Sequence, residues 1–136
     1  MTRRATSTFV FDSRTDIPID ATNDELIERV EIAKTFTGDI RGTSVVHMYG
    51  YKSRVPTSNS YIALERFSVS VHGRSGTFVL RHAAMRTAHD REGSWVIVTD
   101  SGTGALEGIS GTGVLTFHGD GTKTFDLDYD LPDRLV

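Results

Sequence analysis

Three ionisable residues, Lys34, Glu65 and His82, stand among apolar neighbours in segments that predict β-strands. Side chains alternate between the two faces of a strand, and this alternation puts each of the three on the face that carries large apolar side chains. A charge buried without a partner is costly, so such groups are paired, change protonation state, or contact water or a ligand. The three residues are therefore catalytic candidates.

The chemistry that these residue types support is acid–base catalysis. Glu65 with a raised pKa would act as a general acid or base, and Lys34 would stabilise a developing oxyanion. His82 carries an imidazole, a group that suits proton transfer. The alternative is structural: Lys34 and Glu65 would form a buried salt bridge, and His82 would be a hydrogen-bonded interior residue.

Large side chains on the same predicted faces would line a site for an apolar molecule. The predicted ligand-binding residues are Phe36, Tyr61, Phe67, Phe78 and Tyr129.

No sequence motif indicates a metal or an organic cofactor, and we expect neither. The histidines have no paired spacing, and the absence of cysteine excludes thiolate metal sites, disulfides and a cysteine nucleophile. Asp126, Asp128 and Asp130 lack the glycine and distal glutamate of a calcium loop, and are typical of a solvated strand face. The glycine-rich stretch from Gly102 to Gly113 matches neither the phosphate loop nor the dinucleotide fingerprint.

The elements that would position these residues are short strands. The strongest signal is a hairpin from Ser60 to Arg86, in which β-branched and aromatic residues flank a turn at residues 72–76. The other predicted strands are Ala5 to Asp12, Glu28 to Thr37, Thr43 to Lys52, Ser94 to Thr99, Val114 to His118 and Thr122 to Leu131. The pattern leaves open which face of the strand from Thr43 to Lys52 points inward.

Polar and glycine-rich segments separate these strands. Residues 13–23 and 53–59 predict loops, and residues 101–113 predict tight turns or one short helical turn. About eight strands without a long helix predict a sandwich or a closed barrel, and closure is favoured because it removes sheet edges.

Length and composition are those of one ordinary globular domain, expected over residues 1–136 with flexible ends at 1–4 and 132–136. The formal net charge of −3 shows no basic excess, so nucleic acid is not an expected partner. No segment is apolar and long enough for a signal peptide or a membrane span, so a cytoplasmic location without membrane binding is expected.

Several segments taken together resemble an uncharacterised bacterial family, a domain of unknown function. They are Lys34 to Gly42, Leu64 to Arg66, Gly73 to His82, Ser101 to Leu106 and Leu127 to Tyr129. The resemblance covers most of Glu28 to Leu131. It implies an all-β fold, a single eight-stranded antiparallel β-barrel similar to that of allene oxide cyclase, in an assembly that is often oligomeric.

An eight-stranded barrel has room for one small ligand. We expect a small apolar organic molecule in the lumen, handled by a cofactor-free isomerase, cyclase or lyase with Glu65, Lys34 and His82 moving protons. The alternative is a non-catalytic carrier similar to a lipocalin. A third hypothesis is a packed barrel without ligand that acts through the surface of a homo-oligomer.

Overall fold

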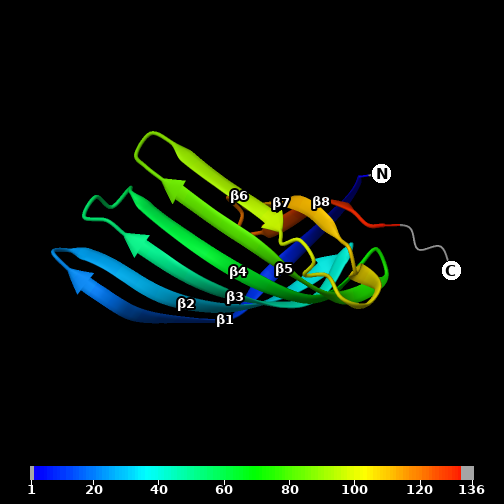
Figure 1. The fold of residues 1–136 in the computed structure, drawn as a ribbon. Helices are drawn as coiled ribbons and strands as arrows, with labels where there is room; N and C mark the ends of the chain where they lie inside the picture. The colour runs from blue at the N-terminus through cyan, green and yellow to red at the C-terminus, as the bar shows by residue number, and fades with distance from the viewer. Residues whose placement is uncertain (1, 133–136) are drawn as a thin grey trace.

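The structure is a computed structural model that describes residues 2–132. Eight antiparallel strands in chain order close into one barrel, with β1 paired to β8 (Figure 1). The strands are β1 (Arg3–Thr22), β2 (Glu25–Gly38), β3 (Ile40–Lys52), β4 (Asn59–Val71), β5 (Arg74–Arg86), β6 (Arg91–Ile97), β7 (Ser110–Phe117) and β8 (Lys123–Asp130). One 3-10 turn, η1 (Gly104–Leu106), precedes β7. The predicted all-β, eight-stranded antiparallel barrel is confirmed.

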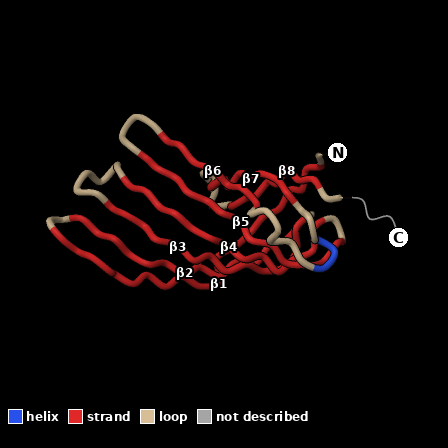
Figure 2. The backbone as a smooth tube through the Cα atoms, in the orientation of Figure 1, coloured by secondary structure: helices blue, strands red, loops and turns tan. Residues whose placement is uncertain are grey.

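The two ends of the barrel differ because its strands differ in length. The hairpins β1–β2, β3–β4 and β5–β6 extend to the left in Figure 1, well beyond β7 and β8, while the start of β1 and the end of β8 lie on the right. The backbone trace in Figure 2 shows three separate loops at these hairpin tips. β1 pairs with β8 only from Arg3 to Thr8, and β6 meets β7 through a single residue pair. One end of the barrel is therefore open along one side.

The other end is filled by aromatic rings. Phe67 stacks on Phe78 with ring centroids 4.6 Å apart, and Phe36 and Phe125 lie 5.1 and 5.6 Å from Phe67. The segment that contains η1 covers this end, because its Leu106 is fully buried in the same core. This end of the barrel is a packed core.

A close backbone approach holds the covering segment in place. The amide of Thr103 donates to the carbonyl of Thr77 across 2.8 Å. A Cβ atom at Gly76 would lie 2.0 Å from the Thr103 carbonyl oxygen, so only glycine fits there. The predicted short helical turn in this glycine-rich stretch is present as η1.

The largest difference from the sequence prediction is at residues 13–23, where a loop was expected. β1 instead continues to Thr22, paired with β2 through register shifts beside Phe11 and Pro18. Pro18 lies beside one of these shifts, in a half of β1 that has a neighbouring strand on one side only, and proline is tolerated at such edge and irregular positions. Arg3 and Arg4 lie in β1, whereas residues 1 and 133–136 lie outside the described residues.

Turns are tighter than the pattern predicts. His72 and Gly73, both with positive φ, form a two-residue turn in place of the expected turn over residues 72–76. Asp39 alone separates β2 from β3, and β6 and β7 begin earlier than predicted. In β3 the inward face carries Ser44 and Val46.

Among residues 2–132 there is no helix with the length and apolar character needed to span a membrane.

Candidate functional site

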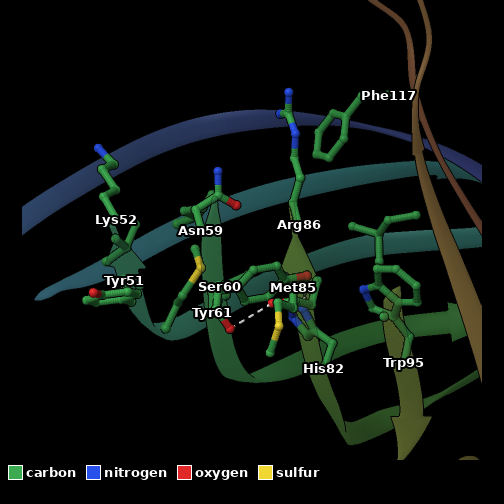
Figure 3. A pocket seen from close by; sticks show the side chains of 18 of the residues that line it. Tyr51, Lys52, Asn59, Ser60, Tyr61, His82, Met85, Arg86, Trp95 and Phe117 are labelled. Carbon is green, nitrogen blue, oxygen red and sulfur yellow. Dashed lines mark hydrogen bonds between the residues drawn. The ribbon is translucent and has the colours of Figure 1, made fainter. Parts of the chain in front are cut away.

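A cavity of about 730 Å³ lies between the long outer halves of the strands. Its deeper wall is mainly apolar, with Val30, Ile32 and Val46 among the lining residues, and it also exposes Lys34 and His82. Figure 3 shows the side chains around it, from Trp95 on β6 to residues near the hairpin tips. A cavity of this size and lining matches sites for small organic molecules.

The three predicted catalytic residues meet at the floor of this cavity. The Lys34 Nζ lies 3.3 Å from Glu65, and the Ser44 hydroxyl donates to Glu65 Oε2 across 2.6 Å. His82 Nε2 lies 3.2 Å from Glu65 Oε1, which is ion-pair distance without the alignment of a hydrogen bond. The strands β2, β3, β4 and β5 each supply one member, because their inward faces are aligned by the barrel register.

The electrostatics of this cluster differ from the sequence expectation. Burial opposes ionisation of Glu65, but His82, Lys34 and Ser44 outweigh it and set the pKa of Glu65 below its usual value. The predicted raised pKa of Glu65 is therefore wrong, since the sequence does not reveal three neighbours that stabilise the carboxylate. Burial lowers the pKa of Lys34, and the Glu65 charge opposes that effect.

The three residues also differ in whether a ligand in the cavity can reach them. The side chain of Glu65 is fully buried and does not line the cavity, whereas Lys34 and His82 do. The Lys34 ammonium also lies 4.6 Å from the centre of the Phe9 ring, a cation–π contact. Glu65 is thus a positioning residue beneath the cavity floor, and the groups that can touch a ligand are its neighbours.

Tyr61 extends the cluster to the cavity surface. Its hydroxyl lies 3.0 Å from His82 Nδ1, and the two rings meet edge to face, as drawn in Figure 3. Burial, together with the Glu65 charge, raises the pKa of Tyr61, so the hydroxyl keeps its proton at neutral pH. Trp95, also in the lining, opposes this rise in the pKa of Tyr61 by hydrogen bonding, although its buried Nε1 has no partner at full hydrogen-bond geometry among residues 2–132.

Of the five predicted ligand-binding residues, only Tyr61 lines the cavity. Phe36, Phe67, Phe78 and Tyr129 point inward as predicted, but they pack at the closed end of the barrel. Strand alternation reveals the face of a residue and not its depth along the barrel, which depends on strand tilt and register.

Several lining residues were missed by the sequence analysis. Glu28 lies on the inward face of β2, buried at 4% exposure, with its carboxylate 3.1 Å from Lys52. Arg86 and Arg91 also line the cavity, where β5 and β6 end and begin. Extending the alternation outward from Lys34 and His82 would have found Glu28 and Arg86.

No metal centre is apparent in the described part of the chain. Within residues 2–132, no group of three or more His, Cys, Asp or Glu side chains is placed to hold an ion. The site offers hydroxyl, imidazole, ammonium and carboxylate groups, which together support proton transfer and charge stabilisation.

Comparisons with known proteins identify the fold and the family. The chain is similar to the crystal structure of a protein of unknown function from the DUF3224 family of Shewanella oneidensis MR-1, with a TM-score of 0.85 and 24% sequence identity. The alignment covers 98% of this chain and 100% of that one, which supports the fold. No curated protein matches the sequence. A family model described as "Protein of unknown function (DUF3224)" matches residues 5–129, and the chain therefore belongs to the DUF3224 family.

Proposed function

We propose that this protein is a cofactor-independent isomerase or cyclase that moves a proton between two carbon atoms of a small apolar molecule bound in the cavity. One observation carries the proposal: a chain of three groups, Glu65, His82 and Tyr61, begins beneath the cavity floor and ends with a hydroxyl in the cavity wall. The likeness to the allene oxide cyclase barrel, expected from the sequence, agrees with such chemistry.

The tautomer of His82 follows from its neighbours. Ionised Glu65 beside Nε2 favours the proton on that nitrogen, which leaves Nδ1 to accept the hydroxyl proton of Tyr61. This arrangement resembles the carboxylate–histidine–hydroxyl logic of other enzymes, in which the carboxylate orients the imidazole and stabilises its charged form. Binding of a substrate would tighten contacts that are poorly aligned in the empty site.

In the reaction, the Tyr61 oxygen takes a proton from a substrate carbon while its own proton passes to His82 Nδ1. The imidazolium is stabilised by Glu65, and the negative charge left on the substrate is stabilised by the Lys34 ammonium. Reversal of the relay returns a proton to a different carbon. The substrate therefore gains and loses one proton, and no electrons are transferred.

The test is proton exchange in heavy water. Compounds that raise the melting temperature of the protein are selected from a panel of apolar carboxylic acids, phenols, epoxides and polyketide-like compounds, then incubated in D₂O and analysed by mass. Wild type should add one deuterium to a hit, and Tyr61→Phe should bind it without exchange. Tyr49→Phe, in an exposed tyrosine of β3, is the matched control. Exchange by Tyr61→Phe at the wild-type rate would contradict the relay.

A carrier is the second candidate, and the completeness of the ion-pair cluster favours it. Lys34, Ser44 and His82 all surround Glu65, as they would in a purely structural network. A carrier predicts that hits bind with equal affinity to wild type and Tyr61→Phe, and that no compound gains deuterium in either protein.

A further inference from the structure

A row of hydrogen-bond donors crosses the mouth of the cavity on the inner face of the strands. Lys52 pairs with Asn59, Asn59 with Arg86, and Arg86 with Arg91, so four neighbouring strands each contribute one member. All four side chains line the cavity, and Figure 3 shows Lys52, Asn59 and Arg86 extending the same way from their strands. The row faces the ligand space.

Two members of the row are a like-charge pair. Arg86 and Arg91 are directly opposite in the antiparallel ladder, an arrangement that destabilises a hairpin. No ion pair joins either guanidinium to a carboxylate of residues 2–132, although Glu92 also lines the cavity and Asp90 accepts the backbone N–H of Arg91. Lys52, by contrast, is paired with Glu28. Among the residues that the structure describes, the two arginines are therefore not held by an ion pair.

The cavity lining carries more positive than negative side chains, although the protein as a whole is negatively charged. Five cationic side chains line the cavity, and three of them are paired with carboxylates: Arg14 with Asp16, Lys34 with Glu65 and Lys52 with Glu28. Arg86 and Arg91 remain, with Glu92 as the other carboxylate in the lining, whereas the whole chain has a formal charge of −3. Charges of one sign in a cleft with low-dielectric walls raise the local concentration of oppositely charged ligands. Positive charge is thus concentrated where a ligand would enter.

We infer that Asn59, Arg86 and Arg91 bind the anionic head of an amphipathic ligand, whose apolar body then occupies the deeper cavity. Paired guanidinium groups match the oxygen geometry of carboxylate and phosphate groups. This inference names the substrate class of the proposed function and rests on ligand binding in the cavity.

The register also sets a length for this ligand. Arg86 and His82 lie on the same face of β5, four residues apart, which corresponds to about 13 Å along a strand. The extended chain of a ligand whose head group is held at the mouth would therefore pass Tyr61, which pairs with Ala84, before it reaches His82. A twelve-carbon anion is long enough to reach them.

The experiment is displacement of a neutral fluorescent probe, N-phenyl-1-naphthylamine, by dodecanoate, dodecyl phosphate and dodecanol below their aggregation limits. The two anions should displace the probe from wild type at lower concentration than the alcohol. Arg86→Gln with Arg91→Gln should reduce this preference about tenfold or more while the probe still binds. Arg66→Gln with Arg81→Gln removes the same charge from the exposed outer faces of β4 and β5, and should keep the preference.

Two of the outcomes separate this inference from the proposed function. If the probe does not bind wild type, both fail. If the probe binds and dodecanol competes as well as dodecanoate and dodecyl phosphate, the cavity binds ligands and the anion site is wrong. A preference for anions that survives in the Arg86 and Arg91 variant would assign the head group to another cation, such as Lys34, and would also overturn the inference. Comparison of dodecanoate with dodecyl phosphate identifies the head group that the site favours.

Discussion

The barrel contains two sets of a carboxylate, a histidine and a tyrosine, one near each end. At the open end Glu65, His82 and Tyr61 are linked by contacts of 3.2 and 3.0 Å. At the closed end the His72 Nδ1 lies 2.6 Å from the Tyr129 hydroxyl, and its Nε2 lies 3.5 Å from Asp39. The functional groups and their order of contact are the same, although the carboxylate is a glutamate in one set and an aspartate in the other.

The two sets differ in which group is buried: the carboxylate at the open end and the tyrosine at the closed end. Glu65 is fully buried and Tyr61 lines the cavity, whereas Asp39 is 43% exposed and Tyr129 is buried at 1%. The closed-end set therefore presents its carboxylate to water and hides its hydroxyl in the core. A matching constellation is not sufficient for a site, because the group that does chemistry must be accessible to a ligand.

The largest expected difference between the ends is in packing. Phe67→Ala removes a ring from the closed-end core and should lower the free energy of unfolding by about 4 kcal/mol. Met85→Ala removes a half-exposed side chain from the cavity wall and should cost less than about 1 kcal/mol. Urea denaturation measures both, and equal losses would show that the open end is packed as tightly as the closed end.

The second-largest expected difference is between the stability effects of substituting the two carboxylates, Glu65 and Asp39. Glu65→Gln leaves Lys34 as a buried charge without its counter-ion, and we expect a loss of about 3 kcal/mol. Adding Lys34→Met should recover part of that loss. Asp39→Asn, at an exposed carboxylate, should have a clearly smaller effect, also by urea denaturation. A loss for Asp39→Asn that matches that of Glu65→Gln would contradict the contrast in burial.

Substitution of either tyrosine should lower the free energy of unfolding by a similar amount, but the two substitutions should differ in their effect on function. Tyr61→Phe and Tyr129→Phe each remove one hydrogen bond to a histidine, which corresponds to about 1 kcal/mol in urea denaturation. Only Tyr61→Phe should abolish deuterium exchange into a bound compound. Loss of exchange in Tyr129→Phe, with folding intact, would place chemistry at the closed end.

The smallest expected effect is on acid sensitivity. The pKa of Glu65 is lower in the folded protein than its ordinary value of 4.5, so the unfolded chain binds more protons as the pH falls below that value. Stability from Glu65 is present above pH 4.5 and is lost as pH falls through the folded pKa. The melting temperature of Lys34→Met with Glu65→Gln should therefore fall less steeply below pH 4.5 than that of wild type.

An internal control makes the acid comparison specific. Thr6 and His72 lower the pKa of Asp39, and Arg4 lowers the pKa of Asp128, so both contribute to acid sensitivity in every variant. Their contribution cancels between wild type and the double variant. Identical slopes in the two proteins would show that Glu65 has no net effect.

Much of the inner surface was predictable from local sequence. The alternation in β4 and β5 correctly assigned Glu65, Phe67, Phe78 and His82 to the inside, because side-chain direction along a strand has a period of two residues. The prediction that Lys34 is also inside is confirmed by its 3% exposure. The same reasoning located the hairpin from Ser60 to Arg86.

Other features depended on pairing between distant segments. Residues 13–22 carry loop-like composition and become strand because β2 offers a partner along their whole length. The depth of the aromatic residues, the ionised state of Glu65 and the alignment of Arg86 with Arg91 were likewise not visible in the sequence. Local alternation determined which side chains point into the barrel. Only the closed sheet, through its register and unequal strand lengths, decided which of them pack and which face an open cavity.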